Sequence, residues 1–417
     1  MSVRIETEHS SSQRSWLWLL ALFTAAGFVE AGFYGQIVAF TPLHLPRLGV
    51  PQASVAEWTG LITALSSAIG LPFLPLWGAL ADRYARQPLI VRSFIVHLVA
   101  AVIMLLAGNV WAFLIGRAVT SFALGNSGLM MTTLSESCPP RRLALAFSIM
   151  NGAPPLGVFV GPLLGGAVVD TWGFPALLGI DSLLMLIVIF ALIFGYRDHF
   201  RGTAREPILG MAVDSVRIIW RSLRLRALFP ALFLLFAGWM LAFTYVPLVI
   251  TELYRGDSPA TAVGIVLAAG GLVTLFLSPA LGSLADRFGH WRVLIAASIL
   301  TVLLWPLPAL TSDLVSFAAA WAVLNGVASG VFAISFTVLS ASAASEVRGR
   351  VMSFAYLPVN VGLLVGPAIG SLVTRASLFA IFPVAALITA LGVAGLFMAA
   401  RLKPALVSEA LPPRAAG

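Results

Sequence analysis

Long apolar stretches, separated by short polar segments, recur along almost the whole 417-residue chain. A hydrocarbon core about 30 Å thick requires about 20 apolar residues in each helical span. Strands of a membrane barrel would be about ten residues long and would alternate in polarity. The pattern therefore predicts an all-α membrane protein with twelve transmembrane helices. The predicted spans are residues 16–40, 56–80, 88–108, 110–134, 143–169, 173–195, 227–250, 259–283, 292–311, 313–338, 350–373 and 376–400.

The composition supports this interpretation. The residue types AVILMFWYC make up 59% of the chain and DEKR only 10%, and the mean hydropathy is +0.98. Soluble domains rarely have such a composition, and no polar segment is long enough to form one. The predicted organisation is a six-helix bundle over residues 1–195, a cytoplasmic linker over 196–226, a second six-helix bundle over 227–400 and a cytoplasmic tail over 401–417.

The basic residues predict the orientation of the chain. With the N-terminus inside, Arg47, Arg255 and Arg375 are the only outer residues among the 25 Lys and Arg, and Arg117 lies within a span. Basic residues prefer cytoplasmic loops, so both termini should be cytoplasmic in the cell (inner) membrane. The preference for cytoplasmic loops explains the net charge of +8, so the charge does not indicate a nucleic acid partner. The linker is either a basic amphipathic helix on the inner leaflet or a segment that follows the charge rule.

Two sequence patterns occur twice. GALADRY at residues 78–84 recurs as GSLADRF at 282–288, an offset of 204, and GVFVGPLLG at 157–165 recurs as GLLVGPAIG at 362–370, an offset of 205. Each half has six predicted spans, so the halves must insert in the same orientation, as parallel repeats. This arrangement predicts a central cavity that opens alternately to the two sides of the membrane.

The motifs resemble those of the major facilitator superfamily over essentially the whole chain. The loop from Gly78 through Asp82 to Arg86 is similar to the family's signature between helices two and three, although Ala85 and Gln87 depart from it. The fifth span resembles the signature of the family's exporters. Leu114 and Arg117, with Gly125, resemble the arginine signature of its proton-coupled exporters. The resemblance implies the twelve-helix drug:H⁺ antiporter group and transport by alternating access.

The resemblance also implies a set of gating residues. Asp82 would dock on the start of helix eleven and lock the halves together, and Arg83 and Arg86 would pair near the inner end of helix four, where Glu136 is available. The alternative is an ordinary inner loop together with glycine-rich packing faces. The predicted gating residues are Gly78, Asp82, Arg83, Arg86, Glu136, Gly157, Gly161, Pro162, Gly165, Gly282, Asp286, Arg287, Gly362, Gly366 and Pro367.

Ionisable groups within spans are candidates for proton coupling, because they are costly in hydrocarbon. Glu30 lies roughly 21 Å along helix one and Arg117 roughly 9 Å from the outer face, at a rise of 1.5 Å per residue. They should therefore have similar depths. We predict Glu30 as the proton carrier and Arg117 as its partner, with a static ion pair as the alternative. For Asp181 and His97 a structural role is favoured over proton carriage.

Polar and aromatic residues on the expected cavity helices are candidates for substrate binding. They are Tyr34, Gln36, Asn126, Met130, Asn151, Trp239, Tyr245, Trp321, Asn325, Phe332, Phe336, Tyr356 and Asn360. Aromatic and methionine side chains form an adaptable wall that suits amphipathic compounds. Each residue could instead serve in helix packing.

The sequence therefore favours a monomeric proton-coupled exporter of small amphipathic or hydrophobic compounds, with the lipid bilayer as its other partner. An exporter or symporter of sugars, metabolites or lipid-like molecules is the alternative. A transport-like sensor and an intramembrane protease, suggested by GNSG at residues 125–128, are remote possibilities. The chain has no metal-ligand cluster, ATP-binding loop or dinucleotide fingerprint. We expect no cofactor, no enzymatic activity, and coupling to an ion gradient, with H⁺ favoured.

Overall fold

A computed structural model describes residues 2–73, 85–123, 126–196, 216–345, 347–352 and 354–402, with the side chains of residues 2–15 and 350 excepted. Within these residues every regular element is a helix, and no strand occurs. Most of the predicted linker (196–226) and of the predicted tail (401–417) lies outside the described residues.

Two groups of helices follow each other along the chain. The first comprises α1 (Ser2–His44), α2 (Val55–Gly70), α4 (Arg86–Leu105), α5 (Val110–Thr120), α6 (Asn126–Ser137), α7 (Leu143–Trp172) and α8 (Phe174–Gly195). The second comprises α10 (Leu223–Leu253), α11 (Pro259–Phe288), α12 (His290–Leu304), α13 (Leu314–Ser342), α14 (Arg348–Met352), α15 (Leu357–Val373) and α16 (Ile381–Arg401). Short 3₁₀ turns occur at Leu45–Leu48, Gln52–Ser54, Leu71–Phe73, Ser121–Ala123, Pro140–Arg142, Leu307–Leu310 and Leu378–Ala380.

Nine helices in the described part are long and apolar enough to cross a membrane. The prediction of a multi-pass helical protein is therefore confirmed, whereas the count of twelve stays a prediction. The three remaining predicted spans are interrupted or partly undescribed. The second continues from α2 into the undescribed residues 74–84, and the fourth is divided between α5 and α6. The eleventh is shortened because α15 begins next to Pro358, which favours the first turn of a helix and not its interior.

Local sequence signals fix several helix ends. Asn109 and Asp313 each accept two main-chain N–H bonds at the starts of α5 and α13, at 2.9–3.0 Å. Gly173 and Gly289 have φ angles of 85° and 96°, which glycine adopts without strain, and they allow the sharp reversals after α7 and α11.

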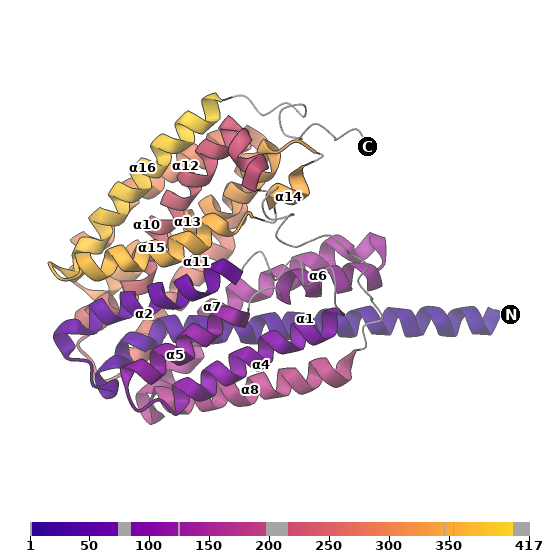
Figure 1. Cartoon of the computed structure of the whole chain (residues 1–417), viewed down its shortest axis with the longest axis horizontal. Coiled ribbons are helices and arrows are strands. Elements are labelled where there is room, and N and C mark those ends of the chain that lie inside the picture. Colours follow the sequence, from indigo (N-terminus) through magenta and orange to yellow (C-terminus); the bar gives the residue numbers. More distant parts are fainter. Residues whose placement is uncertain are drawn as a thin grey trace.

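The two groups of helices form two bundles that meet at one end of the molecule (Figure 1). Contacts between the bundles are made chiefly by α7 with α11 and by α2 with α15. Away from these contacts the bundles diverge toward the side where α1 begins and α16 ends (Figure 1).

The packing inside the bundles repeats with the offset found in the sequence. In the first bundle a Cβ atom at Gly161 would come within 2.7 Å of the carbonyl oxygen of Gly32 on α1. In the second a Cβ at Gly366 would come within 2.5 Å of the carbonyl oxygen of Ala237 on α10. Ala237 follows Gly32 by 205 positions, as Gly366 follows Gly161. The glycines of the repeated motif therefore permit the same close approach of two helices in each half.

Candidate functional site

Glu30 lies at a junction of three helices in the first bundle. Its Oε2 accepts a 2.7 Å hydrogen bond from Asn126 Nδ2 at the start of α6, and its Oε1 lies 3.6 Å from His97 Nδ1 on α4. The Glu30 and His97 side chains are only 20% and 12% exposed. This acidic cluster of Glu30, His97 and Asn126 thus places a carboxyl beside a neutral amide and a titratable imidazole.

The predicted ion pair between Glu30 and Arg117 is absent from the described residues. Arg117 is buried on α5, its Nε has no hydrogen-bond partner among the described residues, and Tyr34 on α1 lies near it. Tyr34 lies one helical turn beyond Glu30. The depth estimate from the sequence could not predict which helix faces the carboxylate. Among the described residues, the titratable side chain found beside the Glu30 carboxylate is that of His97, for which a structural role was favoured.

Asp181 is separate from this acidic cluster. It lies buried on α8, and its Oδ2 has no hydrogen-bond partner among the described residues. A hydrogen-bonded structural role was favoured for Asp181, and no such bond to this oxygen is found within the described residues. Asp181 is therefore a second buried carboxyl whose local contacts do not explain its presence.

A continuous series of aromatic rings runs through the second bundle. Trp239 stacks on Phe243 with ring centroids 5.2 Å apart, and Phe243 lies 6.5 Å from Trp321. On the other side Trp239 lies 6.4 Å from Phe332, and the series continues to Phe336 at 5.0 Å and to Tyr356 at 4.9 Å. We call these six residues the aromatic wall. Only Phe243 was missed in the sequence, where it is one of 27 Phe residues with no distinguishing neighbour.

Four of the other predicted cavity residues serve in helix packing instead. Gln36 donates to the carbonyl of Gly161 at 3.2 Å, and Tyr245 donates to the carbonyl of Pro367 at 2.8 Å. Asn325 bonds to α11, and Met130 lies in the core. Polar side chains buried between membrane helices need such partners, so burial overrides the prediction. Asn151 is exposed, and Asn360 bonds only to the backbone of its own helix, at Tyr356.

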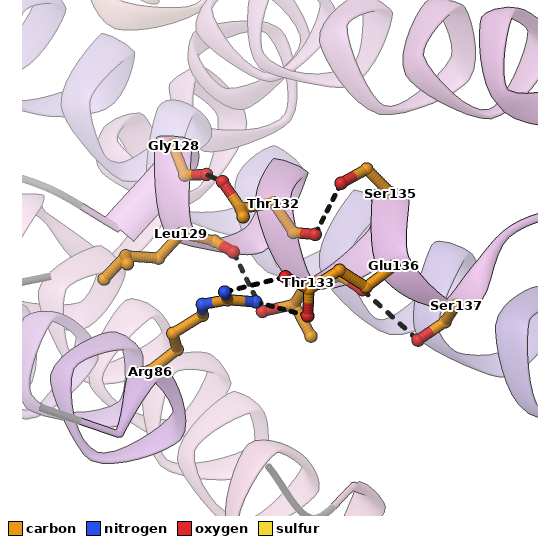
Figure 2. Close-up of polar contacts among 8 residues, drawn as sticks. All are labelled: Arg86, Gly128, Leu129, Thr132, Thr133, Ser135, Glu136 and Ser137. Carbon is orange, nitrogen blue, oxygen red and sulfur yellow. Dashed lines mark hydrogen bonds and ion pairs between the residues drawn. The ribbon is translucent and has the colours of Figure 1, made fainter. Parts of the chain in front are cut away.

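Arg86 and Glu136 join α4 to α6 within the first bundle. The two guanidinium NH groups of Arg86 donate to the two carboxylate oxygens of Glu136 at 2.7 and 2.8 Å. Figure 2 shows Arg86 reaching across to Glu136 near the end of α6. Such a two-point contact fixes the relative position of the two helix ends. Gly78, Asp82 and Arg83 lie outside the described residues.

The second copy of the loop motif has its described polar contact within its own bundle. The carboxylate of Asp286 is 78% exposed and lies 3.1 Å from His290 Nε2, one helical turn away. The Arg287 guanidinium lies over the ring of Phe288, and a Cβ at Gly282 would meet nothing within 4 Å. Within the described residues, the side chains of this loop therefore form no hydrogen bond or ion pair that joins the two halves.

An apolar groove of about 540 Å³ lies between α1 and α7. It extends from Leu17 to Val29 along α1 and from Ile149 to Leu156 along α7. Its volume falls within the range of sites for drug-sized molecules, about 300 to 1,000 Å³. The groove can therefore accommodate an apolar compound or a lipid chain.

Comparisons with known proteins agree with this architecture. The Klebsiella pneumoniae (strain 342) "Multidrug resistance protein MdtG" is 28% identical over 366 residues, which cover 86% of this chain and 85% of that protein. The protein of the same name from Enterobacter lignolyticus (strain SCF1) is 29% identical over 387 residues and 88% of each chain.

Solved structures show the same fold. The nucleoside transporter NupG has a TM-score of 0.75 at 13% identity and covers 92% of this chain and 100% of its own. An inward-facing bacterial homologue of the lysosomal transporter Spinster has a TM-score of 0.71 at 16% identity, with coverages of 94% and 97%. The sequence model of the Major Facilitator Superfamily matches residues 22–296 and 257–416. The chain therefore belongs to the major facilitator superfamily of membrane transporters.

Proposed function

We propose that the protein is a secondary active transporter that exports small amphipathic or hydrophobic compounds in exchange for protons. The observation that carries this proposal is that titratable groups and aromatic rings gather in different bundles. The acidic cluster lies in the first bundle, and the aromatic wall lies in the second. The names of the two MdtG relatives as multidrug resistance proteins support the substrate class.

Glu30 is the proposed proton carrier. A buried carboxylate is costly to ionise unless charged or hydrogen-bonding groups stabilise it. Asn126 supplies one hydrogen bond, and His97 supplies a titratable group that can compensate the charge. The carboxyl can thus release a proton when water reaches it from one side and take up another when the site opens to the opposite side.

The accessible part of the aromatic wall, formed by Trp239, Phe332, Phe336 and Tyr356, is the proposed binding surface for the substrate, whereas Phe243 and Trp321 are buried and support it. Aromatic faces bind apolar rings and attract organic cations. Trp239 also has an indole N–H without a hydrogen-bond partner in the described part of the chain, which can bind one polar group of a substrate. The groove between α1 and α7 is a proposed route for compounds that partition into the bilayer.

In the proposed cycle the protein acts as a monomer in the inner membrane. It has twelve spans, and both termini are cytoplasmic. The bundles meet at the end away from the start of α1 and the end of α16 (Figure 1). With cytoplasmic termini, this conformation is closed on the outer side and open to the cytoplasm. Docking of Asp82 on helix eleven would hold the opposite, outward-open state.

Transport into liposomes tests the proposed function. Inside-out proteoliposomes with an acidic lumen should accumulate ethidium, a lipophilic cation, and accumulation should stop when nigericin abolishes the pH gradient. Glu30→Gln should still bind ethidium but should lose gradient-driven accumulation. Asp181→Asn, which neutralises a buried carboxyl outside the acidic cluster, should retain it. Accumulation in Glu30→Gln that still depends on the gradient would eliminate Glu30 as the carrier. Proton-driven movement in the opposite direction would refute export.

A further inference from the structure

The outer ends of the two bundles are joined by two polar contacts. One lies at the seam between α7 and α11, and the other at the seam between α2 and α15. Neither contact belongs to the acidic cluster or to the aromatic wall.

The first contact joins Asp170 to the start of α11. Asp170 lies in the last turn of α7, and its two carboxylate oxygens accept hydrogen bonds from Ala260 N at 3.0 Å and Thr261 N at 2.7 Å. The first N–H groups of a helix lack partners within it, and the side chain of Ser258 at the helix start does not cap them. A residue of the first bundle therefore caps a helix of the second, with its negative charge at the positive end of the helix dipole.

The second contact is an ion pair between Arg375, just after α15, and Glu57, in the first turn of α2. Its position corresponds to that of the first contact. Arg375 follows Asp170 by 205 positions, and Thr261 follows Glu57 by 204. These are the offsets of the duplicated motifs, so the internal repeat places a polar contact at both seams, although the chemistry of the two contacts differs.

About one helical turn from each polar contact, along α2 and along α11, lies a close backbone contact that also repeats. A Cβ atom at Gly60 of α2 would collide with the carbonyl oxygen of Pro367, and one at Gly264 of α11 would collide with that of Pro162. Gly264 follows Gly60 by 204 positions, and Pro367 follows Pro162 by 205. Each seam thus contains two repeated contacts. One is a glycine packed against a backbone carbonyl, and the other is a polar contact at the outer end of the seam.

We propose that the Asp170 cap of α11 and the Arg375–Glu57 ion pair are two latches of an outer gate, and that they set the balance between the inward-open and outward-open states. This inference rests on the proposed transport function, because alternating access requires both seams to separate. The latches should differ in strength. The Arg375 and Glu57 side chains are 60% and 39% exposed, so water and salt weaken their attraction. The Asp170 cap is partly buried and should be less sensitive to salt.

Distance measurements on spin-labelled protein test the two latches separately. Cys138 is the only cysteine, so Cys138→Ser gives a background free of thiols. One label pair at Gln52 and Ala376 reports on the α2–α15 seam, and a second at Thr171 and Asp257 reports on the α7–α11 seam; all four positions are exposed. Measurements are made in nanodiscs without substrate or gradient.

Each variant should act first on its own seam. Asp170→Asn should raise the ratio of separated to closed α7–α11 seams about fivefold, because it removes a charge-assisted contact. Arg375→Gln should raise the ratio at the α2–α15 seam about twofold, and 0.5 M salt should reproduce that effect. The exchange of both charges in Glu57→Arg with Arg375→Glu should restore closure, whereas each of these substitutions alone should not.

Two control variants separate the latches from general effects of charge. Asp313→Asn neutralises a carboxylate that caps a helix of its own bundle, and Arg255→Gln removes another exposed outer arginine. Both should leave the distances unchanged. Latch variants that behave like these controls would overturn the proposal, as would failure of the charge exchange to restore closure. The distance measurements do not require transport. If the wild-type protein transported no ethidium but the latch variants still showed these shifts, the proposed function would be refuted and the latches would remain supported.

Discussion

His97 Nδ1 on α4 lies 3.6 Å from Glu30 Oε1 on α1, within the first bundle. The same carboxylate accepts a hydrogen bond from Asn126, whereas Arg117 makes no ion pair with it among the described residues. The described environment of the proposed proton carrier is therefore an imidazole and an amide.

A double-mutant cycle should distinguish His97 from Arg117 as the partner of Glu30. We expect the combined Glu30→Gln and His97→Asn variant to show a coupling energy of about 0.5 to 3 kcal/mol in thermal unfolding, because directly contacting groups do not act additively. The cycle of Glu30→Gln with Arg117→Gln should give a smaller value. The measurement is reversible melting of purified protein in detergent. Equal couplings in the two cycles would restore Arg117 as a direct partner.

The aromatic wall should determine substrate affinity. Replacement of Trp239 or Phe336 by Ala removes a ring that contacts two neighbouring rings of the wall. We expect each replacement to weaken ethidium binding about tenfold, which corresponds to the loss of about 1.4 kcal/mol. The measurement is fluorescence titration. Phe317→Ala is the control, because its ring packs on Phe382 outside the wall and should affect stability without changing affinity. Unchanged affinity in both wall variants would exclude the wall as the binding surface.

Much of the fold could be predicted from the sequence because its signals are local. Long apolar stretches predicted the helical spans, and the repeated glycines and prolines indicated two related halves. The same signals recur in the packing, where Gly161 and Gly366 approach Gly32 and Ala237. The end of α5 at Thr120 and the start of α15 beside Pro358 were not predicted, because apolar composition alone does not show where a helix ends within a span.

The partners of the candidate site residues could not be predicted in the same way. Adjacent residues on a helix point about 100° apart, so a small error in rotation decides which neighbour a side chain meets. Gln36 and Asn325 consequently form hydrogen bonds with neighbouring helices, although the sequence predicted that they line a cavity. Asp170 and Arg375 were not predicted as contact residues, although a signal existed: they occupy equivalent positions just after the duplicated fifth and eleventh spans.

The orientation of the chain can be tested by labelling cysteines in intact cells. In the Cys138→Ser background, single cysteines at the exposed positions Gln52 and Ala376 should react with a membrane-impermeant maleimide. A cysteine at the exposed position Arg221, beyond the opposite ends of the spans, should react only after the cells are permeabilised. The expectation follows from the concentration of basic residues on one side. Labelling of position 221 in intact cells would reverse the proposed topology.

The glycines of the two seams provide a steric test of the outer gate that does not depend on charge. In Gly60→Ala the new methyl group would collide with the Tyr245 hydroxyl and the Pro367 carbonyl, and in Gly264→Ala it would collide with the Pro162 carbonyl. Backbone atoms cannot move aside as a flexible side chain can, so each substitution should destabilise the closed seam and favour the outward-open state. Gly282→Ala is the matched control, because it adds the same methyl group to α11 where nothing lies within 4 Å. We expect longer outer distances in the first two variants and an unchanged distance in the third. If Gly60→Ala and Gly264→Ala gave the distances of Gly282→Ala while remaining folded, then the seams would tolerate a side chain, and tight closure at these glycines would not control the outer gate.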